Sequence, residues 1–156
     1  MAKKTTLTRP VMTEVLFDEM YSVPLKGNVR LESLPDSKTL HLQWYGILSH
    51  EDHTKFADMT IDYITQIKAT RWIGDVSHII DPIPVDIAYY IANTWFPEAV
   101  KAGIEKLAIV IPAVEKVIPS TNKIAEVLAQ RHGELLKTFP LKGFNSREES
   151  RQWVYR

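Results

Sequence analysis

The chain has 156 residues, of which 45% are hydrophobic and 24% charged, and its 19 basic and 19 acidic residues give a formal net charge of zero. This length is enough for one domain whose hydrophobic core needs neither disulfides nor a metal. The balanced charge argues against the broad basic field on which non-specific nucleic-acid binding depends, so we expect no nucleic-acid partner. Because the chain has no cysteine, thiol catalysis, disulfides and Cys-based zinc sites are excluded.

No apolar stretch has the length of a membrane span or a secretion signal. The longest run, Leu107 to Ile111, is far too short to cross a bilayer, and residues 1–21 contain no continuous apolar segment of signal-peptide length. We therefore expect a cytoplasmic protein without a membrane span. Residues 1–12 are expected to form a flexible N-terminus, and residues 13–156 a single domain.

The first third of the chain predicts a β-hairpin. Residues 13–23 mix apolar and acidic side chains and fit either an edge strand or a short helix. Val29 to Leu34 then forms one strand and residues 35–38 a turn. In the second strand, residues 39–46, apolar and polar side chains alternate, as they do in a strand covered on one face.

A helix and a strand follow the hairpin. Ser49 is a suitable N-cap for a helix that runs to about Lys68. Its inner stripe would consist of apolar side chains at helical spacing: Phe56, Met59, Tyr63, Ile64 and Ile67. Residues 71–76, "RWIGDV", form the next strand, and the segment from Asp75 to Pro84 leads out of it as a loop with two prolines.

The second half alternates helices with strands. A helix over residues 85–102 should kink or break near Asn93, because Pro97 cannot donate to the carbonyl four residues earlier. Gly103 is a fitting residue to end it. The apolar run at residues 106–112 predicts a strand covered on both faces.

Three shorter elements close the chain. We expect a helix from Ser120 to His132, a strand from Leu136 to Leu141, and a last helix from Ser146 to Trp153 capped by Asn145. Helices that alternate with strands in this way indicate an α/β domain.

Four stretches carry a family resemblance: "LQWYGILSHED", "WIGDVSHIIDPIP", "NTWFPEAVKAGIEKLAIVIP" and "FNSREESRQWV", all within residues 29–154. Their order resembles the STAS, or anti-sigma-factor-antagonist-like (SpoIIAA-like), family. It is most similar to the bacterial branch grouped with CRAL-TRIO-type lipid-binding domains. The resemblance implies an α/β, SpoIIAA-like single domain in which an N-terminal β-hairpin and helix–strand repeats form a mixed sheet flanked by helices.

The phosphoserine switch of that family is expected to be lost. In its phospho-regulated members the loop after this strand reads D-L-S…D-S-S-G, and a serine in it is the kinase target. Asp75-Val76-Ser77 matches the first part and Asp81 the later aspartate, but residues 82–84 are Pro, Ile and Pro. Ser77 remains a candidate phosphosite; alternatively, its hydroxyl satisfies backbone groups in a turn.

Two constellations suggest catalysis only weakly. His50 and His53 share a first helical turn and could bind zinc if His41 or His78 completed the set, although acidic residues between them also suit the helix dipole. Ser77, His78 and Asp75 or Asp81 have the residue types of a hydrolase triad, but neighbours on one extended segment point apart. No G-x-S-x-G elbow is present. We expect no enzyme, no cofactor and no metal.

Four aromatic residues follow the loop on one helical stretch: Tyr89, Tyr90, Trp95 and Phe96. Successive helical residues diverge by about 100°, so these side chains cannot all face the core. Tyr90 and Trp95 are the favoured core residues. The others could line an apolar pocket near the carboxyl ends of the strands, or form a contact patch on the surface.

These observations lead to a first hypothesis and two alternatives. The first is a regulatory module that docks a protein partner or a second copy of itself. The residues expected to bind are Asp75, Ser77, His78, Asp81, Tyr89, Trp95 and Phe96. The second is a carrier of a small apolar or lipid-like ligand, held between the 85–102 helix and the sheet. The third is a metal-dependent enzyme built on His50 and His53. A pocket among the aromatic residues would favour the carrier, and a closed core under an exposed aromatic patch would favour docking.

Overall fold

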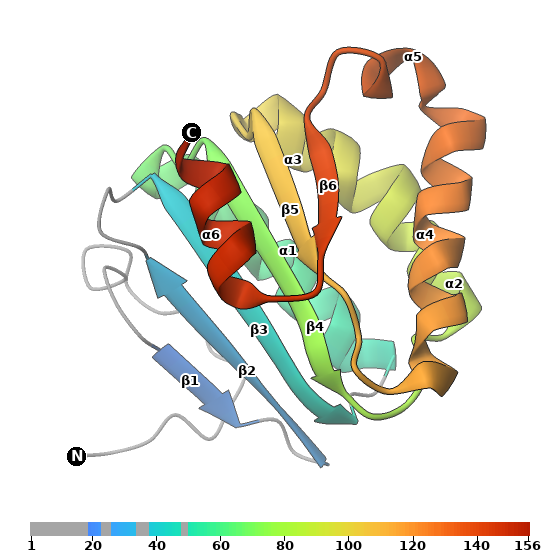
Figure 1. The fold of residues 1–156 in the computed structure, drawn as a ribbon. Coiled ribbons are helices and arrows are strands. Elements are labelled where there is room, and N and C mark those ends of the chain that lie inside the picture. The colour runs from blue at the N-terminus through green and yellow to red at the C-terminus, as the bar shows by residue number, and fades with distance from the viewer. Residues whose placement is uncertain (1–18, 23–25, 34–37, 48–49) are drawn as a thin grey trace.

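The computed structural model describes residues 19–22, 26–33, 38–47 and 50–156, and within them a six-stranded sheet forms the centre (Figure 1). The strands lie in chain order across the sheet: β1 Glu19–Ser22, β2 Lys26–Ser33, β3 Thr39–Ile47, β4 Arg71–Ile79, β5 Lys106–Val110 and β6 Leu141–Phe144. The first three strands are antiparallel to one another, and β3 to β6 are parallel. The predicted α/β class with a mixed sheet is confirmed.

Helices cover the two faces of this sheet unequally (Figure 1). One face carries α1 His50–Ile67, α2 Val85–Tyr90, α3 Phe96–Ala102 and α4 Ile118–Arg131, with the short α5 Gly133–Leu136 after them. The other face carries α6 Arg147–Tyr155, which packs on β4 and β5. In the described part of the chain, no helix is long and apolar enough to cross a membrane.

The alternation in β3 assigns its side chains to these two faces. Leu40 and Leu42 join the large core under α1, whereas His41 and Gln43 point to the face that carries α6. Because a strand turns successive side chains to opposite faces, the hairpin pattern in the sequence already contained this division. A smaller core of Ile73, Ala108, Val110 and Val154 lies beneath α6.

The predicted interruption of the 85–102 helix is confirmed: a π-helical turn, η2, at Ile91–Trp95 separates α2 from α3. This turn contains Asn93, whose carbonyl receives no hydrogen bond from Pro97 because proline has no N–H. Gly103 ends the helix with a φ of 129°, a left-handed conformation that favours glycine.

Several predicted boundaries were wrong by a few residues. Helix α4 begins at Ile118 with Pro119 in its first turn, so Ser120 is not its cap; the Ser120 hydroxyl instead accepts the N–H of Ile83 at 3.0 Å. Strand β6 begins at Leu141, because the residues before it form α5 and a turn.

The cap of α6 was also misassigned by one residue. It is Ser146, whose hydroxyl accepts the N–H of Glu149 at 3.2 Å, and not Asn145. Of residues 13–23, Glu19–Ser22 forms an edge strand that pairs with β2. The predictions for residues 1–12, the turn at 35–37, the Ser49 cap and the Phe56 side chain lie outside what the structure describes.

Candidate functional site

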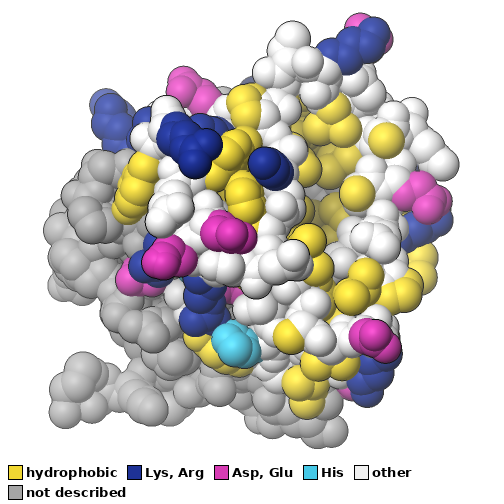
Figure 2. All heavy atoms as spheres, in the orientation of Figure 1, with side chains coloured by type: hydrophobic (Ala, Val, Ile, Leu, Met, Phe, Trp, Pro, Cys, Tyr) yellow, Lys and Arg dark blue, Asp and Glu magenta, His cyan; other side chains and the backbone are white. Residues whose placement is uncertain are grey.

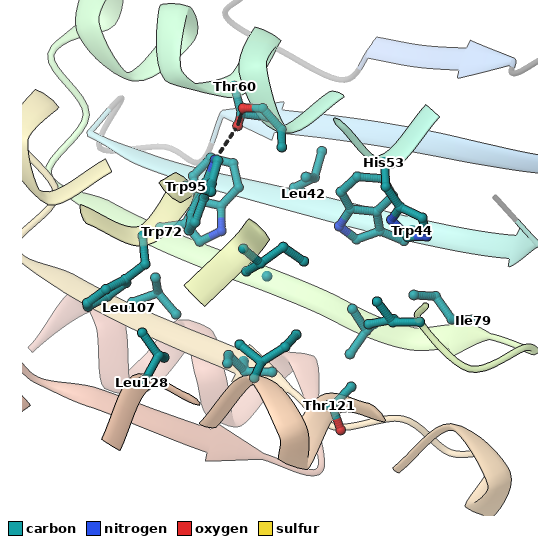
Figure 3. Close-up of a pocket in the computed structure, with 18 of the residues that line it drawn as sticks. Leu42, Trp44, His53, Thr60, Trp72, Ile79, Trp95, Leu107, Thr121 and Leu128 are labelled. Carbon is teal, nitrogen blue, oxygen red and sulfur yellow. Dashed lines mark hydrogen bonds between the residues drawn. The ribbon is translucent and has the colours of Figure 1, made fainter. Parts of the chain in front are cut away.

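An apolar cavity of about 120 Å³ lies between the sheet and its main helical layer (Figure 3). Strands β3, β4, β5 and β6 contribute to its wall on one side, and α1, η2, α3 and α4 on the other. The lining residues are Leu42, Trp44, His53, Ala57, Thr60, Trp72, Gly74, Val76, Ile79, Ile83, Ile91, Trp95, Phe96, Leu107, Ile109, Thr121, Ile124, Leu128 and Leu141. Apolar side chains dominate this wall, as they do in sites that take hydrocarbon-rich ligands.

The floor of the cavity is one face of the sheet. Strand β4 contributes Trp72, Gly74 and Val76, which are two residues apart and therefore share a face. Gly74 has no side chain to place there, so the floor is lowest at this residue. The cavity thus lies over the middle of β4, where a larger residue would fill part of it.

The helical wall is built around the π-helical turn. Trp95 and Phe96 are successive residues, yet both line the cavity and both are buried, with 7% and 2% of their surface exposed. The Trp95 indole N–H donates to the hydroxyl of Thr60 at 2.9 Å, and its ring lies 5.1 Å from that of Trp72 (Figure 3). The turn therefore brings both aromatic side chains into the wall at one level of the helix.

The cavity opens toward one side of the molecule. Figure 2 shows the surface hollowed between β6 and α4, with hydrophobic side chains inside the hollow. The pocket residues of these two elements are Leu141 on β6 and Thr121, Ile124 and Leu128 on α4. A small molecule could enter the core along this edge without unfolding the sheet.

The few polar groups of the wall are mostly engaged. The Thr60 hydroxyl donates to the carbonyl of Ala57 at 2.7 Å, and that of Thr121 donates to the carbonyl of Ile118 at 2.8 Å. His53 is 6% exposed, and its ring centroid lies 5.2 Å from that of Trp44. No Lys, Arg, Asp or Glu is among the described residues that line the pocket, and none of these can therefore neutralise a buried ion there.

A cluster of polar side chains lies on the opposite face of the sheet, beneath α6. Its centre is Asp75, which is 0% exposed and accepts a hydrogen bond from His41 at 3.1 Å and one from the Ser77 hydroxyl at 2.5 Å. The guanidinium of Arg147 also bonds this carboxylate, and Arg151 donates to the other ring nitrogen of His41 at 3.0 Å. Helix α6 is thus tied to the sheet through charged hydrogen bonds.

The titration of this cluster follows from burial and these partners. Burial alone would raise the pKa of Asp75, but the hydrogen bonds from His41 and Ser77 outweigh it and hold that pKa well below its usual range. Burial lowers the pKa of His41, against the opposing effect of Asp75. A neutral His41 that donates to Asp75 and accepts from Arg151 agrees with both pKa shifts. The cluster therefore serves to hold α6 on the sheet.

The predicted loop is shorter than the sequence suggested. Strand β4 continues to Ile79, so Asp75, Ser77 and His78 belong to the strand and the loop begins at Ile80. Asp75 is fully buried and cannot touch a partner, which corrects its expected place at a binding rim. His78 is exposed and stacks on Tyr45, with ring centroids 5.1 Å apart.

The remaining predicted residues separate into different surroundings. Asp81 forms an exposed ion pair with Lys116 at 3.2 Å. Trp95 and Phe96 lie in the cavity wall, whereas Tyr89 does not line it and instead lies beneath Lys123 and Arg131.

The hydrolase and metal constellations do not assemble. The Ser77 hydroxyl is bonded to Asp75, and the ring of His78 packs against Tyr45. His50 forms an exposed pair with Asp86 at 2.6 Å. Among the described residues, no group of three or more His, Cys, Asp or Glu side chains could hold a metal ion.

Comparison with known proteins identifies the fold. The chain aligns with the crystal structure of an uncharacterized protein from Shewanella loihica PV-4, of the DUF3478 family and described as having a SpoIIAA-like fold. The TM-score is 0.50 at 16% identity, over 83% of this chain and 94% of the other. No family model and no curated protein matches the sequence. The chain therefore has a SpoIIAA-like fold, which confirms the fold expected from the resemblance.

Proposed function

We propose that the protein is a non-enzymatic binding protein for a small apolar ligand, which it holds in the cavity between the sheet and the 85–102 helical segment. The observation that carries this proposal is the apolar wall around a space of about 120 Å³ that opens at the surface. An engineered apolar cavity of about 150 Å³ stays dry and binds benzene, so this size suits a small hydrocarbon body.

A simple packing fault would account less well for the cavity. Protein interiors are close-packed, and voids larger than a water molecule are few, because their lining loses van der Waals contacts. Here three large side chains, Trp44, Trp72 and Trp95, line the space, and none of the three occupies it. Gly74 at its floor adds volume that a valine, a residue enriched in strands, would remove.

Native mass spectrometry of the purified protein, beside its denatured mass, tests this function when it is combined with a cavity-filling variant. Ala57 is 6% exposed and lines the cavity, so Ala57→Leu places three more carbon atoms in it. The exposed Ala125 on α4 offers the matched control Ala125→Leu. We expect a non-covalent excess mass on the wild type and the control, reduced at least severalfold on Ala57→Leu. Equal excess mass on all three would place the ligand elsewhere.

A second function, docking of a protein partner, is supported by the surface beside the cavity. Among the described residues the exposed large hydrophobic side chains are Ile80, Val85 and Tyr155, and two of them, at 47% and 62% exposure, bracket the loop. Between them Ile83 is buried and lines the cavity. We propose that a partner or a second copy of the chain binds residues 80–85. Through Ile83, a ligand in the cavity would alter this binding, as in a regulatory module.

Sedimentation velocity tests the homodimer form of this second function. A double variant, Ile80→Asp with Val85→Asp, adds charge to the exposed positions only and should leave the fold intact. We expect a wild-type dimer that dissociates in this variant but persists in Tyr155→Asp, which changes the exposed hydrophobic residue on the distant α6. A wild type that is monomeric at all concentrations would rule out self-docking.

A further inference from the structure

One buried polar group in the cavity lacks a partner in the part of the chain that the structure describes. Trp72 is 4% exposed, and its indole N–H meets no hydrogen-bond acceptor there, whereas the neighbouring indole of Trp95 is bonded to Thr60. Figure 3 shows the two rings together, with the Trp95 nitrogen turned to Thr60 and the Trp72 nitrogen on the side of the pocket. Buried donors are almost always paired in native proteins, so this one needs an explanation.

The space in front of this N–H is kept open by Gly74. A Cβ built on Gly74 would stand 3.4 Å from the Trp72 nitrogen, which is the nearest heavy atom to it. Glycine weakens a strand interior, and it recurs where a ligand or a backbone approaches closely. Its position in the middle of β4, beside a donor without a partner among the described residues, therefore points to an acceptor atom from a bound molecule.

The residues that line the cavity also limit the charge that a ligand can carry. Among the described lining residues His53 is the one titratable side chain, and none of them is a lysine or an arginine. A carboxylate or phosphate inside the cavity would lose its hydration without gaining a counter-ion. A neutral carbonyl or ether oxygen would lose far less and would satisfy the indole donor.

We propose that the ligand is a small, uncharged, largely hydrocarbon molecule with a single hydrogen-bond acceptor, and that this acceptor bonds the N–H of Trp72. This inference rests on the proposed function, because it names the class of ligand that the same cavity takes. Trp72 fixes the orientation of the ligand, and the remaining wall contributes through burial of apolar surface.

A pair of probes with nearly the same shape tests the inference. Acetophenone has a carbonyl oxygen where α-methylstyrene has a CH₂ group, and benzoate adds a negative charge. We would titrate each into the full-length protein and follow the indole signals of its 4 tryptophans in ¹H–¹⁵N NMR spectra. The Trp72 signal is assigned by its absence from Trp72→Phe. We expect acetophenone, and not α-methylstyrene, to move that proton downfield, and benzoate not to bind.

Two variants make the test quantitative. Trp72→Phe keeps an aromatic ring but removes the donor, so the ratio of the two dissociation constants should shift by about tenfold toward α-methylstyrene. Gly74→Ala keeps the donor and fills the space before it, so both probes should bind less tightly.

The outcomes separate this inference from the function on which it rests. Binding of both probes with an unchanged ratio in Trp72→Phe, or with no shift of the Trp72 proton, overturns the hydrogen bond but leaves the apolar site. Binding of benzoate within tenfold of acetophenone overturns the uncharged class. Failure of both neutral probes to bind overturns the apolar site itself. If Trp72→Phe does not fold, the Trp72 signal is assigned by triple-resonance experiments on the wild type, and its shift on addition of acetophenone decides the question.

Discussion

The substitution Asp75→Asn tests how the sheet holds α6. It preserves the shape of a side chain that is 0% exposed but removes its negative charge. That charge lies among the ring N–H of His41, the hydroxyl of Ser77 and the guanidinium of Arg147. The amide can still accept from the Ser77 backbone, which donates to the aspartate at 3.0 Å. The charge-assisted part of the network is therefore what the variant loses.

The structure sets the size of the effect. Removing one partner of a buried ion pair costs about 3–5 kcal/mol, and a hydrogen bond to a charged group contributes about 1.5–3 kcal/mol. Arg147 is 34% exposed and can turn to water in the variant, so we expect the lower limit, a loss of about 3 kcal/mol at pH 7. Urea unfolding followed by circular dichroism measures it. A loss below about 1 kcal/mol would refute the assigned role of the carboxylate.

The pH dependence supplies an independent check with a definite sign. The folded pKa of Asp75 lies below its unfolded value, so below about pH 4 the unfolded chain takes up a proton that the folded chain does not. The stabilisation is present above that pH and is lost as the pH falls. Asp75→Asn lacks this titration, so the stability difference between the two proteins should shrink between pH 7 and pH 3. A difference that stays constant or grows would contradict the argument.

Two further predictions compare matched pairs of variants by the same unfolding assay. Arg147→Met should lower the free energy of unfolding by about 2–3 kcal/mol, because it removes the cation that faces a buried carboxylate. Arg151→Met should lower it by about 1 kcal/mol, since the ion pair of Arg151 with Glu32 is partly exposed. Equal losses in the two variants would contradict this difference. Thr60→Val leaves the buried Trp95 donor unpaired and should cost about 1–3 kcal/mol, whereas Thr54→Val, at a hydroxyl exposed on the same helix, should change stability by less than about 0.5 kcal/mol. A Thr60 variant as stable as its control would mean that the Trp95 bond contributes little.

Much of the fold could be predicted because local patterns specify it. Alternation in residues 39–46 indicated a strand with one polar face, and β3 has that division. Pro97 located the break in the 85–102 helix, since a missing N–H acts only four residues away. The near-continuous apolar run at residues 106–112 marked β5 as a strand buried on both faces.

The end of β4 could not be predicted for a physical reason. Asp75 and Ser77 are the residue types of a turn, and nothing nearby in the sequence indicates that a strand can bury them. The groups that make burial possible, His41 and Arg147, lie 34 and 72 positions from Asp75. Such long-range pairing is visible only once the chain has folded.

The cavity was expected as an alternative, but its composition was not foreseen. Trp95 and Phe96 were among the residues expected to bind a partner or ligand, whereas Trp44, Trp72 and Gly74 were not. A cavity depends on how side chains from several distant elements pack together, so no local sequence pattern predicts it. The one local signal was Gly74, a glycine inside an apolar strand sequence.

The central claim is that the cavity between the sheet and its main helical layer binds a small apolar molecule. The most direct measurement is a methyl NMR titration of the full-length protein with α-methylstyrene. We expect chemical-shift changes at cavity methyl groups such as Ile91, Ile109 and Leu128, and none at Ile73 and Val154, which form the core beneath α6. Unchanged cavity signals at saturating probe, or equal changes on both faces of the sheet, would contradict the account.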